Sequence, residues 1–341
     1  MSRATVRVGL VGTGYAARLR ADALQAEPRS QLVAVAGHDH DRTTDFSSPY
    51  GAEVVPWVEL VQRDDIDLVI VATVNRDHGP IAKAAVAHGK AVVVEYPLAL
   101  DLQEAIAIVA AARQQGTLLH VEHIELLSGI HHTIQSGLPE IGTPFYVRYV
   151  SMAPKRPAPK RWSYSPALFG FPLVGALSRV HRLIDLFGEV KTVVCNLQMW
   201  SSDGDVVAPD SAAVFGTVLC SAQLRFASGL LAEVVYGKGQ ALWDAQRRFE
   251  AQGSLGRLRV DREGGELQLD KETRHLAIGS RRGLFAQDTA MVLDALLQPT
   301  QSSLYVTAEQ SLYALRVADA ARRSAIAGQV ISLLETKTVL R

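Results

Sequence analysis

The first third of the chain alternates short apolar runs with segments whose apolar residues recur every three to four positions. The apolar runs predict strands at 6–11, 32–36, 68–72, 91–94 and 118–121. The longer patterns predict helices at 15–26, 81–87 and 102–113. Strands separated by helices indicate a parallel sheet covered on both faces, and right-handed crossovers make it doubly wound. We therefore expect an α/β domain over residues 1–124.

Beyond residue 125 most apolar runs follow one another without a helix between them. They predict strands at 145–150, 192–199, 213–220, 223–226, 230–236, 247–251, 258–260 and 267–269. Helical patterns cover 172–187, 286–297 and 308–327. We expect an α+β domain over 125–341 with a large, mostly antiparallel open sheet. Its closing helix, 308–327, could pack back on the N-terminal domain.

Composition narrows the classes of partner. Of 341 residues 48% are apolar and 21% are charged, and the formal net charge is zero, which argues against nucleic acid and anionic membranes as partners. The N-terminus lacks a signal-peptide pattern, and no run of about 18 apolar residues predicts a membrane helix. We expect a cytoplasmic protein, monomeric or homodimeric, in which Cys195 and Cys220 are free thiols.

A glycine-rich turn follows the first predicted strand and begins the first predicted helix. Its sequence is GxGxxA, at Gly12, Gly14, Tyr15, Ala16 and Ala17. The first glycine allows a tight turn, the second lets the backbone approach a pyrophosphate, and the small third residue lets helix pack on strand. The helix N-terminus favours the anionic diphosphate. The motif predicts a Rossmann domain that binds a dinucleotide.

The end of the second predicted strand indicates which dinucleotide binds. An NAD site usually places an acid there to bind the ribose hydroxyls, but the corresponding residue is Gly37. His38 and Arg42 are nearby donors for a 2′-phosphate, while Asp39 and Asp41 could also lie near the ribose. We predict NADPH/NADP⁺ as the cofactor, with NADH used more weakly.

Several further segments carry a resemblance to a known family. The GxGxxA turn, ATVNRDH (72–78), GKAVVV (89–94) and Glu95-Tyr96-Pro97 together resemble the glucose–fructose oxidoreductase/inositol dehydrogenase family. The resemblance implies a dinucleotide-binding domain joined to an open, mostly antiparallel α/β domain. It also implies that Thr73, Asn75 and His78 line the nicotinamide side of the cofactor, and that Glu95 orients the nicotinamide end.

The chain departs from that family where the alcohol chemistry is done. The family's sugar and polyol dehydrogenases have lysine where this chain has Tyr96, and aspartate and histidine where it has Ser178 and Arg182. Oxidising an alcohol needs a base with a pKa near neutral, which arginine and an ordinary tyrosine do not provide. These departures predict an electron-poor carbon acceptor with no hydroxyl to deprotonate.

The departures match one branch of the family. VVVEYPLAL (92–100), LLHVEHIELLSGIH (118–131), PKRWSY (159–164) and FGFPLVGALSRVHRLIDLFG (169–188) resemble the biliverdin reductases, and most nearly those of cyanobacteria. That resemblance implies NADPH-dependent reduction of biliverdin IXα to bilirubin IXα at the C10 methine, with protonation of a pyrrole nitrogen. The catalytic candidates are Arg179, Arg182 and Tyr96. The substrate-binding candidates are Tyr96, Glu122, His123, Arg161, Trp162, Arg179 and Arg182.

These residues also have interpretations that involve neither catalysis nor substrate binding. Arg179 or Arg182 could make a structural ion pair with Asp185 or another acid. Lys160, Arg161, Arg281 and Arg282 could bind the bilin propionates or be solvated surface charges. The cluster of His120, Glu122, His123 and Glu125 fits no strong metal template, so we predict no metal. The alternative functions are a sugar or polyol dehydrogenase and a non-catalytic NADP(H)- or bilin-binding regulator.

Overall fold

A computed structural model describes residues 5–208, 211 and 213–333. The chain forms two compact units, which are described separately below. Unit 1 contains Met1–Ile124 and Arg282–Tyr313, and unit 2 contains Glu125–Arg281 and Ala314–Arg341. We expected all of residues 125–341 to form the second domain. In the structure Arg282–Tyr313 belong to unit 1 instead.

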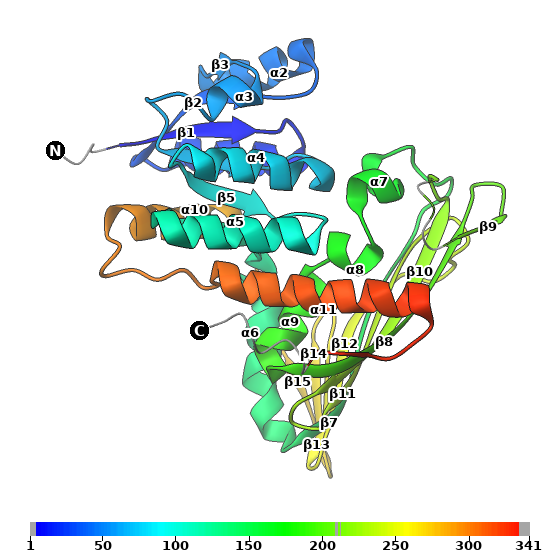
Figure 1. Cartoon of the computed structure of the whole chain (residues 1–341). Coiled ribbons are helices and arrows are strands. Elements are labelled where there is room, and N and C mark those ends of the chain that lie inside the picture. Colours follow the sequence, from blue (N-terminus) through cyan, green and yellow to red (C-terminus); the bar gives the residue numbers. More distant parts are fainter. Residues whose placement is uncertain (1–4, 209–210, 212, 334–341) are drawn as a thin grey trace. The chain divides into compact units, whose positions relative to one another are not determined.

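Unit 1 is built on a six-stranded parallel sheet (Figure 1). The strand order is β3-β2-β1-β4-β5-β6, which is the doubly wound arrangement that the sequence pattern predicts. The strands are β1 (Val6–Val11), β2 (Ser30–Ala36), β3 (Glu53–Val54), β4 (Leu68–Val71), β5 (Ala91–Glu95) and β6 (Leu119–Glu122). Five of these strands are buried over most of their length, as their Val, Ile and Leu runs require, whereas the two-residue edge strand β3 is not buried.

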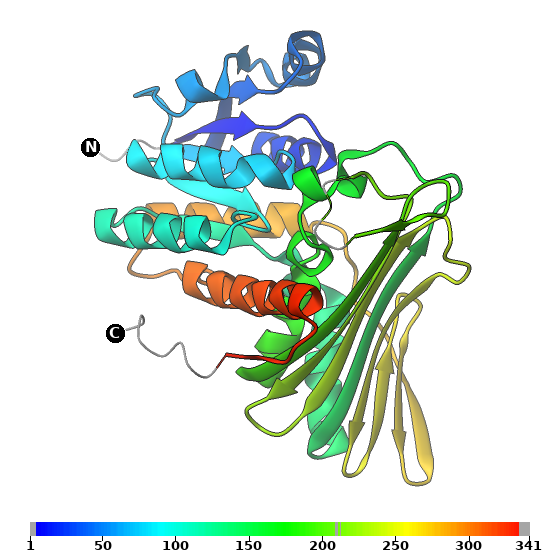
Figure 2. The same cartoon turned by 45° about the vertical axis from the view of Figure 1, so that its right-hand side comes forward.

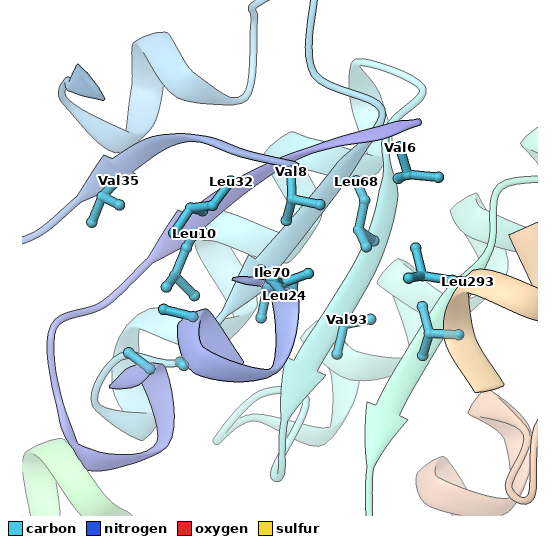
Figure 3. Packing of buried hydrophobic residues seen from close by; sticks show 14 of the residues in the cluster. Val6, Val8, Leu10, Leu24, Leu32, Val35, Leu68, Ile70, Val93 and Leu293 are labelled. Carbon is cyan, nitrogen blue, oxygen red and sulfur yellow. The ribbon is translucent and has the colours of Figure 1, made fainter. Parts of the chain in front are cut away.

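Helices cover both faces of this sheet. On one face α1 (Tyr15–Ala26) and α10 (Leu284–Leu297) pack against alternate strand residues, and Figure 3 shows Leu24 and Leu293 beside Val8, Ile70 and Val93. On the other face α4 (Asn75–Ala87) and α5 (Leu102–Gln115) lie side by side (Figures 1 and 2). The remaining helices of unit 1 are α2 (His40–Ser47) and α3 (Trp57–Leu60).

Unit 2 is built on a ten-stranded sheet whose long strands run side by side (Figure 2). The order is β15-β14-β13-β12-β7-β11-β10-β8-β16, with β9 paired to β8, and every pair is antiparallel except β11 with β7. The strands are β7 (Pro144–Pro154), β8 (Val190–Trp200), β9 (Val206–Val207), β10 (Thr217–Phe226), β11 (Leu231–Gly239), β12 (Gln246–Gly253), β13 (Gly256–Val260), β14 (Gly265–Leu269), β15 (Glu272–Leu276) and β16 (Ile331–Ser332). The predicted fold class, a Rossmann domain joined to an α+β domain, is confirmed.

One face of this sheet is apolar and covered. Along β10 buried and exposed residues alternate, as expected for a sheet with one solvated face.

The helices of unit 2 are α6 (Gly129–Gly137), α7 (Pro166–Phe169), α8 (Pro172–Gly175), α9 (Ser178–Phe187) and α11 (Ala308–Ala327), whose first residues count with unit 1. Single 3₁₀ turns lie at Ser48–Tyr50, Ile124–Leu127, Leu138–Ile141 and Trp162–Tyr164.

Three predicted elements of unit 2, two strands and one helix, have the wrong boundaries. The strands predicted at 213–220 and 223–226 form one continuous strand, β10, because Ser221 lies on the exposed face and does not interrupt pairing. The helix predicted at 172–187 is two helices, α8 and α9. They are separated after Gly175, which packs so closely on the ring of Phe169 that a Cβ would lie 2.5 Å from it.

Within the described residues, no helix combines the length and the apolar character that crossing a membrane would require.

Candidate functional site

The turn between β1 and α1 has the geometry of a diphosphate site. Gly12 has a φ of +129°, and a Cβ there would lie 2.2 Å from the carbonyl oxygen of Ala72 at the end of β4. Gly14 begins α1, and no side chain caps the free N–H groups of that helix. No atom lies within 4 Å of where a Gly14 Cβ would be, so the backbone is open there. These features fit a bound pyrophosphate at the helix N-terminus.

The other residues of the turn divide between solvent and core. Tyr15 is 81% exposed at the first position of α1. Ala16 packs against the core cluster, and Ala17 is fully buried in it. A larger side chain at Ala17 would push α1 away from the sheet.

The end of β2 has no room for an acidic side chain. A Cβ on Gly37 would lie 2.2 Å from the hydroxyl oxygen of Thr43 and 2.9 Å from the methyl group of Thr13. Asp39 caps α2, because its carboxylate accepts a hydrogen bond from the Arg42 amide at 2.8 Å. His38 is exposed, with its Nε2 3.0 Å from a carboxylate oxygen of Asp77.

His78, in the helix that follows β4, contacts the backbone after β4 and after β5. His78 is buried, with Nδ1 2.8 Å from the carbonyl oxygen of Pro97 and Nε2 3.3 Å from that of Thr73. Burial lowers the pKa of His78, so its ring is neutral and links α4 to the chain after β5. Asn75 is buried at the start of α4. These contacts hold Thr73 and Pro97 in place, and the placement of His78 on the nicotinamide side of the cofactor stays a prediction.

A buried ion cluster lies where β5 ends. The Arg20 guanidinium, on α1, donates to Glu95 at 2.8 Å and to Asp288 on α10. Asp288 also accepts from Tyr305 and contacts His120. Burial opposes ionisation of Asp288, but the charge of Arg20 and the His120 contact hold its pKa well below its usual value. Sequence reasoning identified Glu95 and missed Arg20 and Asp288, which lie 268 residues apart.

Glu122 is the member of this cluster whose pKa is raised. It pairs with Glu95 in the register of β5 and β6, and both burial and the neighbouring Glu95 charge raise its pKa well above the usual value. Glu122 therefore holds its proton more tightly than an ordinary glutamate, and it shares a hydrogen bond with Glu95. Glu122 is only 1% exposed, so we expect it to support Glu95. The sequence analysis instead predicted Glu122 as a substrate contact.

Tyr96 follows Glu95 and stacks on His123. The two rings are 5.4 Å apart and nearly parallel, and the Tyr96–Pro97 peptide bond is cis. His123 is buried, with its Nε2 2.9 Å from the hydroxyl of Ser311. In the structure His123 packs against the Tyr96 ring, and its role as a substrate contact stays a prediction.

In unit 2 a single carboxylate organises the arginines. Glu125 contacts Arg182, Arg247 and Arg281, with Nη2 of Arg182 3.2 Å from its Oε2. Burial raises the pKa of Glu125, but the surrounding guanidinium groups outweigh that effect and lower it. Arg182 is buried and also donates to the Tyr149 hydroxyl at 2.8 Å. Its partner acid is thus Glu125, whereas Asp185 contacts His131.

Arg179 lies one helical turn before Arg182 and lines a pocket. This pocket has a volume of about 740 Å³ and is formed by residues at one end of the sheet. Its cationic side chains, seven in all, far outnumber its two acids, Asp261 and Glu263. The seven are Lys155, Arg179, Lys238, Arg247, Arg248, Arg259 and Arg262.

Most of these cations were missed by sequence reasoning, because no local pattern brings strands β7, β11, β12 and β13 together. The predicted candidates Arg161 and Trp162 lie elsewhere: Arg161 is exposed, and Trp162 packs on Phe169 with ring centroids 5.8 Å apart. Arg281 pairs with Glu125. Across the described part of the chain, no three His, Cys, Asp or Glu side chains come together as a metal site.

The fold and the dinucleotide turn define the class of protein. Residues 6–123 match the model of an oxidoreductase family with an NAD-binding Rossmann fold, and residues 138–333 match its C-terminal alpha/beta domain. The chain belongs to this oxidoreductase family, whose models are named for GFO, IDH and MocA.

Individual relatives include both sugar and bilin enzymes. The solved biliverdin reductase from Synechocystis sp. PCC 6803, in complex with biliverdin and NADP⁺, is 45% identical, with a TM-score of 0.88 over 94% of this chain and 98% of that one. A dTDP-3,4-didehydro-2,6-dideoxy-alpha-D-glucose 3-reductase from Streptomyces antibioticus is 31% identical, covering 75% of this chain and 76% of its own. Mouse biliverdin reductase A is 27% identical over 58% of this chain and 63% of its own.

Proposed function

We propose that this chain reduces biliverdin IXα to bilirubin IXα. When bound, NADPH supplies the hydride, which adds to the C10 methine carbon of the bilin. Two electrons pass to the bilin, and a pyrrole nitrogen takes up one proton. Unit 1 holds the cofactor and unit 2 binds the bilin.

The observation that carries the proposal is the cationic pocket of unit 2. Biliverdin is a large, flat tetrapyrrole with two propionates, and guanidinium groups bind carboxylates through paired hydrogen bonds. A pocket of about 740 Å³ with seven cations and two acids suits a dianion of that size. The solved relative in complex with biliverdin and NADP⁺ supports this assignment.

The end of β2 supports NADPH as the cofactor. Gly37 leaves no space for the acid that would repel a 2′-phosphate, and the Asp39 carboxylate is committed to capping α2. His38 and Arg42 are exposed donors that follow this strand end in the sequence. We expect Gly12 and Gly14 to contact the pyrophosphate, and Thr73 to lie on the nicotinamide side.

The residues at the alcohol-oxidising positions support an acceptor without a hydroxyl. Tyr96 is stacked on His123, and Arg182 is buried in its ion pair with Glu125. Neither can act as a base near neutral pH. The similarity to a sugar 3-reductase makes ketone reduction the alternative function. Reducing a ketone would need a proton donor, whereas oxidising an alcohol needs a base.

Arg179 is the cation that we expect to stabilise the developing negative charge. It lies in the pocket wall, and its guanidinium is 5.6 Å from the centroid of the Tyr236 ring. A fixed cation beside a developing anion lowers the barrier, so Arg179→Ala should slow biliverdin turnover by about 100-fold or more. A nearly normal rate in this variant would remove Arg179 from the mechanism.

The direct test is to mix the protein, NADPH and biliverdin IXα and to follow the bilin absorbance. The proposal predicts conversion to bilirubin with one NADPH oxidised per bilin. In parallel, a dTDP-3-ketosugar with NADPH, and inositol or glucose with NADP⁺, test the sugar alternatives. Robust sugar turnover without bilin turnover would overturn the proposal, as would tight NADPH binding with no oxidation of it by biliverdin.

A further inference from the structure

Lys238 is a buried lysine in the wall of the cationic pocket. It is the next-to-last residue of β11, where its strand neighbours are Val218 on β10 and Ala153 on β7. Only 7% of the residue is exposed, although it lines the pocket together with Arg179. A lysine so deeply buried usually has either an ion-pair partner or a chemical role.

Aromatic rings surround the Lys238 ammonium. Its Nζ lies 3.8 Å from the ring centroid of Phe169, 4.9 Å from that of Tyr164 and 5.5 Å from that of Phe215. Nζ also donates a hydrogen bond to the Ser163 carbonyl oxygen. The rings and the carbonyl hold a normally flexible side chain in one position beside the pocket.

The surroundings of the Lys238 ammonium favour loss of its proton. Burial is the main cause, and the Arg179 cation adds to it, so that the pKa of Lys238 falls to about 7. Arg179 approaches from α9, Tyr164 from the 3₁₀ turn and Tyr236 from its own strand, while Lys155 and Arg247 line the same pocket. Among the residues with described positions, no carboxylate forms an ion pair with Lys238 to oppose this effect.

Without a group such as Lys238, the proposed reaction has no proton donor. Hydride addition at C10 leaves an electron pair and a negative charge on a pyrrole nitrogen. Arg179 can stabilise that charge, but a guanidinium does not release a proton near neutral pH. General acids work best when their pKa lies near the operating pH.

We propose that Lys238 is the general acid that protonates the pyrrole nitrogen of the reduced bilin. In this step an N–H bond of the ammonium breaks and a pyrrole N–H bond forms. The lysine is left as a neutral amine, and water returns its proton before the next turnover. The inference rests on the proposed biliverdin reduction and assigns the proton donor in it.

This role predicts how the rate depends on pH. The active form of Lys238 is the protonated one, so kcat should be highest below pH 7 and should fall about tenfold per pH unit well above it. Lys238→Arg keeps the positive charge but cannot donate. We expect it to bind biliverdin normally, to turn over roughly 100-fold more slowly, and to lose this pH dependence.

The experiment measures kcat across pH for wild type, Lys238→Arg, Lys238→Ala and Lys155→Met, with bilin and NADPH dissociation constants determined separately. Lys155→Met removes a charge from the same pocket, so it should weaken bilin binding and leave the pH profile of kcat unchanged. Alkylammonium ions of different pKa, added to Lys238→Ala, should restore turnover to a degree that depends on their pKa. A lysine that only supports the structure would give no such dependence.

The outcomes separate this inference from the proposed function. If wild type reduces biliverdin but Lys238→Arg keeps its rate and pH profile, only the role of Lys238 is overturned. The same holds if alkylammonium ions do not restore Lys238→Ala while its binding of bilin and NADPH is normal. If wild type does not reduce biliverdin, the proposed function falls and this inference falls with it.

Discussion

At the scale of single residues, the most consequential side chains in unit 1 are those that hold buried charge. Arg20 and Asp288 are both essentially inaccessible, and each is the other's main counter-ion. Removing one partner of such a pair leaves the other charge buried and uncompensated, which is far more costly than losing a surface pair. The integrity of α1 and α10 should therefore depend on this contact.

We expect Asp288→Asn to lower the free energy of unfolding at pH 7 by about 3 kcal/mol. Because folding lowers the pKa of Asp288, its contribution is present above the unfolded pKa of about 4 and is lost as the pH falls below it. Urea unfolding at pH 7 and at about pH 3, below the unfolded pKa, measures the difference, which should shrink at the lower pH.

Asp294→Asn is the matched control on the same helix. Asp294 pairs with Arg29, but its side chain is 45% exposed, so the change should be below about 1 kcal/mol. Equal losses in the two variants would contradict the role given to the buried pair.

At the scale of elements, the register of β5 and β6 explains an acid whose pKa is raised. Strand pairing sets Glu95 beside Glu122, and Arg20 neutralises only one negative charge of that pair. Folding raises the pKa of Glu122, so its contribution to stability is complete below pH 4 and declines as the pH rises toward the folded pKa.

Glu122→Gln should therefore gain stability relative to wild type as the pH rises from 5 to 8, because glutamine has no proton to lose. Glu95→Gln is the matched variant, and it should be destabilised at pH 7 by its lost ion pair with Arg20. Thermal unfolding across this range tests both. If Glu122→Gln were as destabilised as Glu95→Gln at pH 8, the assignment of the proton to Glu122 would be wrong.

At the scale of the whole molecule, unit 1 is assembled from two separate stretches of chain. Val292 and Leu293 of α10 belong to its hydrophobic core, and Asp288 belongs to its ion cluster. A fragment of residues 1–124 would expose that core surface and leave Arg20 without Asp288.

We predict that the fragment 1–124 does not unfold cooperatively on heating. Residues 1–124 joined by a flexible linker to 282–313 should unfold cooperatively and bind NADPH. Circular dichroism melting and NADPH fluorescence compare the two proteins directly. Cooperative unfolding of the shorter fragment would show that Arg282–Tyr313 is dispensable for the unit.

The sequence pattern predicted unit 1 more accurately than unit 2, for physical reasons. In unit 1, helix 15–26 and strand 6–11 match the structure residue for residue, because strong periodicity and the glycine turn between them mark their ends. The helix predicted at 172–187 failed, since its break depends on Gly175 approaching Phe169. That contact joins residues close together in the sequence, but hydrophobic periodicity does not mark it.

The sequence by itself determined the fold class, the dinucleotide turn, the missing acid at Gly37 and the loss of the alcohol-oxidising residues, because each depends on local spacing or side-chain chemistry. Only the tertiary structure decided which charges meet. Glu125 contacts arginines from α9, β12 and the connection before α10, Arg20 pairs with Asp288, and Lys238 lies among aromatic rings in the same pocket wall as Arg179. Pairing of distant strands and helices creates these contacts, and their pKa shifts follow from burial, which no short stretch of sequence specifies.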